Sequence, residues 1–308
     1  MRTKRRGYVL LVVLAVLVLM VTVLATLSKL SLRRGLAAAD AQLRLQQRWG
    51  ADSIEAALLP RAAKLFDRLQ QQADQQRTET GLAVPFPGPL RDVITIGGVT
   101  FDIVIADEDA KLNLNRVYHS GGQQQTLTAI NDLVGPTASR AVRLVPAVRP
   151  LQQSPPVESD ESSEEIPRAL RSWGEVFDLV ALREIVGDDA ALPNVTDQIT
   201  CWGGGALNIR RASDQAIQTA AATVLSDAGA RRLVSRYRDG APMNAAILIQ
   251  QEADSETQRS RLRRMLAETS THFSLWIDAS TTGRRSGRTF SVMRLTDDGL
   301  VINQRFAF

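Results

Sequence analysis

Residues 8–27 read YVLLVVLAVLVLMVTVLATL, twenty consecutive residues without a charged side chain. At a rise of 1.5 Å per residue, this stretch forms a helix of about 30 Å, long enough to cross the hydrocarbon core of a bilayer. Four basic residues precede it, namely Arg2, Lys4, Arg5 and Arg6. After it, the one basic residue close by is Lys29. Because cytoplasmic flanks of membrane helices carry the excess of lysine and arginine, we expect Met1 in the cytoplasm and the remaining residues, roughly 280, across the membrane.

Three interpretations of this N-terminus are open. A secretory signal peptide would be cut near residues 23–25, but its apolar core is normally only about 7–15 residues long. A plain uncleaved anchor is the second interpretation. The third starts from Gly7, which lies between the basic leader and the apolar run. This order resembles the class III signal of type IV pilins and type II secretion pseudopilins, and the resemblance implies a prepilin peptidase cut between Gly7 and Tyr8.

The fifth residue after that cut is Val12. Most pilins and pseudopilins have a glutamate at this place, which pairs with the N-terminal amine of a neighbouring subunit. A buried carboxylate without a partner is costly in hydrocarbon, so a subunit that never occupies the ordinary stacking position gains by losing it. Among pseudopilins, the K-type minor subunit, which sits at the tip, typically lacks this glutamate.

The composition excludes several classes of protein. The 308 residues carry 37 basic and 33 acidic side chains, and because four of the basic ones lie in the first six residues, the body is neutral. A nucleic-acid-binding protein would need its basic excess on the body. One cysteine, Cys201, forms no internal disulfide, and with only His119 and His272 no Cys/His zinc site can be assembled.

The pattern beyond the apolar run predicts an α+β fold. Apolar residues at three-to-four spacing continue the helix to about residue 73 as a stem. Residues 93–105, VITIGGVTFDIVI, alternate on both sides of Gly97-Gly98 and predict a β-hairpin. Alternation returns at the C-terminus and predicts further strands around residues 273–277, 290–292 and 300–302. We therefore expect a pilin-like antiparallel sheet packed on a stem helix.

The region between these strands has a helical pattern, in residues 126–145, 168–186, 213–237 and 254–268. Residues 154–165, SPPVESDESSEE, hold two prolines, five acids and no base, and we interpret them as a solvated linker. The predicted organisation is a leader at 1–7, a transmembrane helix at 8–28 and a stem with the first strands at 29–117. A helical insert then occupies 118–268, and the C-terminal strands occupy 269–308.

A polar motif follows the predicted hairpin: residues 107–115 read DEDAKLNLN. Alternation of Leu112 and Leu114 with Asn113 and Asn115 puts both amides on one side of a short extended segment, where they can satisfy backbone groups. A related segment, ALNIRRA, recurs at 206–212. The acids at 107–109 have oxygen ligands for calcium, although Lys111 stands where a calcium loop needs an acceptor. Capping of a turn is the other interpretation.

The motifs, in their order along the chain, resemble the K-type minor pseudopilin of type II secretion. The matching features are the glycine followed by an apolar helix without the glutamate, then Asp107, Glu108, Asn113 and Asn115, then Asn208, and finally the strand after Ser270. Arg210 and Arg211 depart from the family, which usually has Asn-Thr there. Members of this family can bind calcium in the globular domain, and the resemblance makes Asp107 and Asp109 the candidate ligands here.

The resemblance also implies a role at the pseudopilus tip in protein export, together with other minor pseudopilins, inner-membrane components and the prepilin peptidase. It implies a single-pass inner-membrane protein with a periplasmic C-terminal domain and a methylated N-terminus. Two alternatives stay open. One is a minor pilin of a type IV or competence pilus. The other is a membrane-anchored periplasmic enzyme with Cys201, next to Trp202 and three glycines, as its nucleophile.

Overall fold

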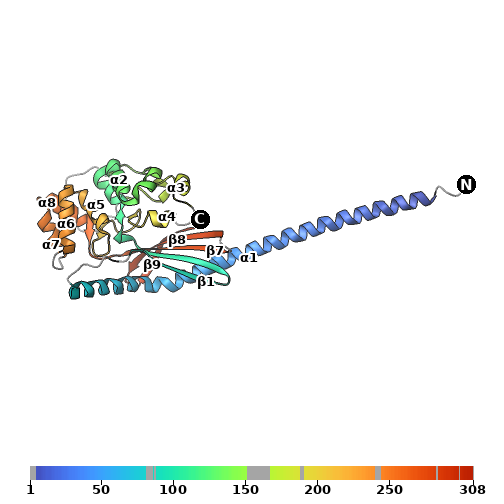
Figure 1. The fold of residues 1–308 in the computed structure, drawn as a ribbon, viewed down its shortest axis with the longest axis horizontal. Coiled ribbons are helices and arrows are strands. Elements are labelled where there is room, and N and C mark those ends of the chain that lie inside the picture. Colours follow the sequence, from blue (N-terminus) through green and yellow to red (C-terminus); the bar gives the residue numbers. More distant parts are fainter. Residues whose placement is uncertain are drawn as a thin grey trace.

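The computed structural model describes residues 5–80, 86, 88–150, 167–187, 191–239, 244–281, 284–297 and 299–307. The first element, α1 (Arg5–Thr80), is a single helix of 76 residues, which corresponds to about 114 Å. Its N-terminal half projects from the rest of the chain, and its C-terminal half lies along a sheet (Figure 1). The predicted stem is thus continuous with the apolar helix. The predicted acidic linker at 154–165 lies outside the described residues.

The sheet has five antiparallel strands in the order β1-β2-β7-β8-β9. Their bounds are Leu90–Ile96 (β1), Val99–Asp107 (β2), His272–Thr281 (β7), Arg284–Thr296 (β8) and Gly299–Ala307 (β9). The hairpin predicted at Gly97-Gly98 is confirmed: both glycines have positive φ, 60° and 82°, and Ile96 faces Val99 across the turn. The three C-terminal strands predicted from alternation are also present.

The other helices that the structure describes lie between β2 and β7 in the sequence and on the face of the sheet opposite α1 (Figure 1). The helices and short 3₁₀ turns are η1 (Glu108–Ala110), α2 (Leu114–Ala138), η2 (Ser139–Ala141), η3 (Trp173–Glu175), α3 (Leu179–Val186), α4 (Ala191–Val195), α5 (Asp214–Ala222), α6 (Asp227–Asp239), α7 (Ala245–Glu252) and α8 (Glu256–Met265). Two short parallel pairs join this region together: β3 (Leu112–Asn113) with β4 (Ile199–Thr200), and β5 (Leu207–Asn208) with β6 (Leu266–Ala267). The α+β class is confirmed.

Several predicted boundaries inside the helical region were wrong. Helix α2 begins at Leu114, so the boundary predicted at residue 118 falls inside a helix. Residues 168–178, expected to be helical, form a loop and a short 3₁₀ turn. Residues 213–237 contain two helices with a break after Ala222. These segments are short, and a few apolar residues at helical spacing do not fix where a helix starts or stops.

Two cores lie on the two faces of the sheet. The one beneath α1 is formed by alternate residues of β2 and β7 with the buried face of α1, among them Ile54, Phe66, Phe101, Phe273 and Ile277. The other is larger and joins the opposite face of the sheet to the helices. Strand β7 is buried on both sides: Phe273 and Ile277 face the core beneath α1, and Trp276 faces the helical region. The chain is therefore three layers: helix α1, the sheet, and the helical region.

Candidate functional site

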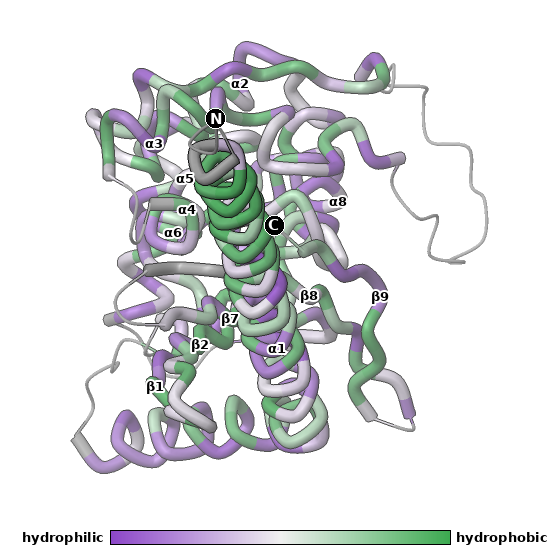
Figure 2. Tube along the Cα trace, turned by 90° about the vertical axis from the view of Figure 1, so that its right-hand side faces the viewer, coloured by the Kyte–Doolittle hydropathy of each residue, from purple (hydrophilic) through white to green (hydrophobic). Residues whose placement is uncertain are grey.

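Helix α1 carries the N-terminal features predicted from the sequence. Among the described residues, α1 is the one helix long and apolar enough to cross a membrane, and none of its most apolar window is buried. Figure 2 shows this part of the tube as an unbroken apolar stretch. The helix is regular through Gly7 and Tyr8, and the side chains of Tyr8 and Val12 are exposed. A bare apolar surface of this length requires lipid or other helices as its surroundings.

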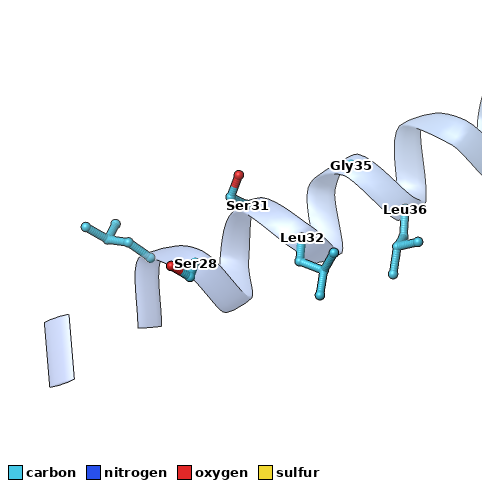
Figure 3. A pocket seen from close by; sticks show the side chains of 6 residues that line it. Ser28, Ser31, Leu32, Gly35 and Leu36 are labelled. Atoms are coloured by element: carbon cyan, nitrogen blue, oxygen red, sulfur yellow. The ribbon is translucent and has the colours of Figure 1, made fainter. Parts of the chain in front are cut away.

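A shallow depression lies on α1 just beyond this stretch (Figure 3). Its lining comes from one face of α1 alone, from Leu27 to Leu36, and includes Ser28, Ser31 and Gly35. In the part of the chain that the structure describes, no second element supplies a facing wall, so the depression is helix surface and does not have the enclosed form of a ligand site.

The motif at 107–109 forms a buried turn at the end of β2, which we name the carboxylate turn (Asp107, Glu108 and Asp109). Asp107 begins the 3₁₀ turn: its Oδ1 accepts hydrogen bonds from the backbone N–H of Asp109 (3.0 Å) and Ala110 (3.2 Å). Its Oδ2 accepts from Arg211 Nη1 (2.9 Å) and Ser270 Oγ (2.6 Å). Burial raises the pKa of Asp107 to about 6, although Ser270 and Arg211 act in the opposite direction.

Glu108 joins the sheet to the helical region. Its Oε1 accepts hydrogen bonds from Lys111 Nζ (2.6 Å) and from the Ser274 hydroxyl on β7. Its Oε2 accepts from the Thr200 hydroxyl on β4. The carboxylate and the ammonium are both buried, so the pair is an internal tie between elements distant in the sequence.

Asp109 holds the start of β7 and the loop that contains Gly203, Gly204 and Gly205. Its Oδ2 accepts from the backbone N–H of Thr271 (2.7 Å) and His272 (3.0 Å), and its Oδ1 accepts from the N–H of Gly204 (2.8 Å). Burial alone would raise the pKa of Asp109, but the hydrogen bond and charge of His272 and the N–H groups of Thr271 and Gly204 lower it below its ordinary value.

The carboxylate turn does not fit a calcium ion. The oxygens of Asp107, Glu108 and Asp109 already accept hydrogen bonds from protein donors, and Lys111 is ion-paired to Glu108 where a ligand would be needed. Within the described ranges, no group of three His, Cys, Asp or Glu residues could hold a metal ion. Capping, the other interpretation open from the sequence, is the role that Asp107 has.

The asparagines of the motif satisfy backbone groups, as predicted. The predicted extended segment is present as far as Asn113 and was wrong for Asn115, which lies in α2. Asn113 ends the short strand β3 and caps α2, accepting from Arg116 N (3.1 Å) and donating to Trp202 O (2.7 Å). Asn115 lies in the first turn of α2. Its amide donates to the carbonyls of Leu170 and Cys201, both at 2.9 Å, and accepts from Leu170 N at 2.7 Å.

Asn208 in the related segment 206–212 has a similar place. It follows a leucine in the short strand β5, accepts from Arg210 N (3.0 Å) and donates to Ser270 Oγ (2.8 Å). Ser270 also donates to Asp107, so Asn208 is joined through one hydroxyl to the carboxylate turn. The predicted motif residues from 107–115 and 206–212 are thus brought together around the end of β2.

We expect Asn115→Ala to lower the free energy of unfolding by about 2 kcal/mol, because it leaves buried backbone groups of Leu170 and Cys201 without partners. Urea unfolding of the detergent-solubilised chain, followed by tryptophan fluorescence, measures this loss. Asn131→Ala, an exposed position on the same helix, is the matched control and should change the value by less than about 0.5 kcal/mol. An equal loss in both variants would contradict the bridging role.

Cys201 does not have the setting of a nucleophile. The thiol is fully buried, and burial, followed by the charges of Glu175 and Glu108, raises its pKa well above the usual value. The two histidines have other partners: His272 contacts Asp109, and His119 Nε2 lies 2.6 Å from Pro167 O. Trp202, next to the thiol, is buried against Trp173 and Phe290 in the core.

Arg210 and Arg211, which departed from the family pattern, connect the helical region to α1. Arg211 donates from Nη2 to Asp67 (2.8 Å) and from Nε to Gln70 (2.7 Å), in addition to its pair with Asp107. Arg210 is ion-paired with Asp74. Sequence reasoning missed this contact, and the only signal for it was the polar stripe at residues 67, 70 and 74 on one side of the stem helix.

Comparisons with known proteins give matches among solved structures alone. No protein-family model matches the sequence, and no curated protein matches it. The solved GspK-GspI-GspJ complex of the type 2 secretion system from enterotoxigenic Escherichia coli is similar to the chain with a TM-score of 0.44 and 15% sequence identity. The match is to one chain of that structure and covers 88% of this chain and 99% of that chain. A similarity of this size does not by itself assign a function.

Proposed function

We propose that the chain is a minor pseudopilin of a type II protein secretion system, anchored in the inner membrane with its N-terminus in the cytoplasm. The observation that carries the proposal is the continuity of α1. The exposed apolar stretch that follows Gly7 runs without a break into the stem that packs on the antiparallel sheet. One helix thus serves as the membrane anchor and as the helix on which the sheet packs.

The proposed role is physical and not enzymatic. The apolar helix holds the subunit in the bilayer until the prepilin peptidase has cut after Gly7 and partner pseudopilins withdraw it into the pseudopilus. Val12, apolar where most subunits carry a glutamate, supports a place at the tip, because a tip subunit has no neighbour above whose amine would need that carboxylate. The bulk of the helical region on the outer face of the sheet supports the same place.

The test is the N-terminal residue and intact mass of the membrane-extracted protein, with and without a prepilin peptidase. We expect chains that begin at Tyr8 only when the peptidase is present. Gly7→Val should remain uncut and should abolish protein export, because the bulky side chain stands at the cut. Gly35→Val, at a position with open space around it, is the matched control and should be processed normally.

Two outcomes would contradict the proposal. Chains that begin at Met1 or near Thr26 in both strains would indicate an ordinary anchored or secreted protein. Loss of pili with normal protein export in the Gly7→Val strain would favour the alternative, a minor pilin of a type IV or competence pilus.

A further inference from the structure

Three arginines gather where the last helix of the helical region meets the first: Arg116 in the first turn of α2, and Arg261 and Arg264 on α8. We name them the arginine cluster. Arg261 Nη2 donates to the carbonyl of Ser120 at 3.4 Å, which fixes α8 against the start of α2. Helix α8 lies at the end of the body farthest from the N-terminus (Figure 1), and the Arg264 side chain is exposed there.

Among the described residues, no acid forms an ion pair with the three arginines of the cluster. Arg116 is half-buried, and its Nε is closed off from solvent with no acceptor. The acid on α8, Glu256, is paired with Arg259 and Arg263 instead. Burial, and then the charge of Arg264, lowers the pKa of Arg116 to about 10. A half-buried guanidinium beside a like charge is unfavourable without an anion, so the arrangement is that of a site whose ligand supplies the charge.

The shape of the cluster favours carboxylates spaced along a chain over a single phosphate. Phosphate sites commonly use free N–H groups at a helix N-terminus. At the start of α2, the side chain of Asn113 already accepts the N–H of Arg116. The charged groups come instead from separate side chains, two of them three residues apart on α8. Guanidinium groups at such spacing bind carboxylates by charge-assisted, bidentate hydrogen bonds.

We propose that the arginine cluster is a binding site for an acidic peptide segment of a partner protein. The carboxylates of the segment pair with Arg264 and Arg261 at the surface and with Arg116 beneath them. Helix α8, which carries two of the three arginines, lies at the end of the body farthest from the N-terminus (Figure 1), where a partner in the same compartment as the body has access to it. This inference does not depend on the role in secretion, because it rests on the positions, burial and charges of the three arginines.

The test uses the full chain in detergent and two fluorescent probes, hexaglutamate and hexaglutamine, with anisotropy measured at low and at physiological salt. We expect binding of hexaglutamate only, and weaker binding at the higher salt. Arg116→Gln and Arg264→Gln should each lower the affinity roughly tenfold, the value for one lost charge-assisted hydrogen bond. Arg231→Gln, an exposed arginine on α6, removes the same charge elsewhere and should change the affinity less than twofold.

The thermal midpoint separates a lost site from a lost fold. Removal of an unbalanced half-buried charge should leave the midpoint of Arg116→Gln unchanged or raise it. Equal affinity of wild type and Arg116→Gln, or equal competition by inorganic phosphate and hexaglutamate, would overturn the proposal.

A second arm tests the chain's own acids at 154–165, because Val148 and Pro167 contact Tyr118 and His119 next to Arg116. If the probe binds only after those five acids are changed to amides, the occupant is internal and the partner proposal is overturned.

Discussion

Replacing Arg211 with methionine is expected to lower the free energy of unfolding by about 3–5 kcal/mol, the range for breaking a buried ion pair by removal of one partner. The side chains of Arg211 and Asp107 are 3% and 2% exposed. Methionine keeps an apolar stem of similar length beside Phe66 and Phe86, over whose rings the guanidinium lies. The loss therefore reports the lost bonds of the guanidinium and not a cavity. Most of it comes from the charge left on buried Asp107, because Asp67, the other acid paired with Arg211, is 62% exposed.

The effect of this substitution should depend on pH. The pKa of Asp107 in the folded chain is raised to about 6, so the stability linked to this carboxyl is fully present below its ordinary pKa of 3.8 and is lost as the pH rises through 6. Arg211 lowers that pKa, so its removal raises it further. At pH 5 the variant neutralises Asp107 by protonation, whereas at pH 8 the charge is buried without its partner. The loss should be larger at pH 8.

Urea titrations of the detergent-solubilised chain at pH 5 and pH 8 measure both quantities. Arg210→Met is the control: its pair with Asp74 is 37% and 49% exposed, and its removal should cost less than about 1 kcal/mol. Equal losses for Arg211→Met at the two pH values would show that Asp107 does not titrate as its burial requires.

Long periodic segments were predictable from the sequence, and contacts between distant segments were not. The stem helix and the Gly97-Gly98 hairpin have patterns that repeat over many residues, so only one conformation buries their apolar side chains. Residues 112–115 alternate over only four positions, which a strand end and a helix start satisfy equally well. The structure has both there, with β3 ending at Asn113 and α2 beginning at Leu114.

The role of the carboxylate turn was half predictable. That Asp107 caps a turn follows from its place after a strand, because local hydrogen bonds are visible in the local sequence. The partners of its second oxygen are not visible in the local sequence, because Arg211 lies 104 residues away and Ser270 lies 163 residues away. A single sequence gives no signal for such pairs. The two arginines were noticed only because they departed from a family pattern.

At Gly50, α1 packs closely against the sheet, and Gly50→Leu is expected to lower the free energy of unfolding by about 3 kcal/mol, the upper range for overpacking a core. A Cβ atom at this residue would lie 2.2 Å from Cζ and 2.8 Å from Cε2 of Phe101. The Phe101 ring is completely buried, so it has no space into which to move. The clash outweighs the roughly 0.5–1 kcal/mol gained when a helical glycine is replaced.

Gly35→Leu gives the matched control, because nothing lies within 4 Å of a Cβ at Gly35, and there only the helix gain of about 0.5–1 kcal/mol should be seen. Adding Phe101→Ala to Gly50→Leu makes space for the leucine, so the double variant should lose less stability than the sum of the two single variants. If the two single losses of stability add strictly, the side chains at positions 50 and 101 do not clash. Coupling would mean that this contact fixes α1 on the sheet, so that a pull on the apolar half of the helix is transmitted directly to the body.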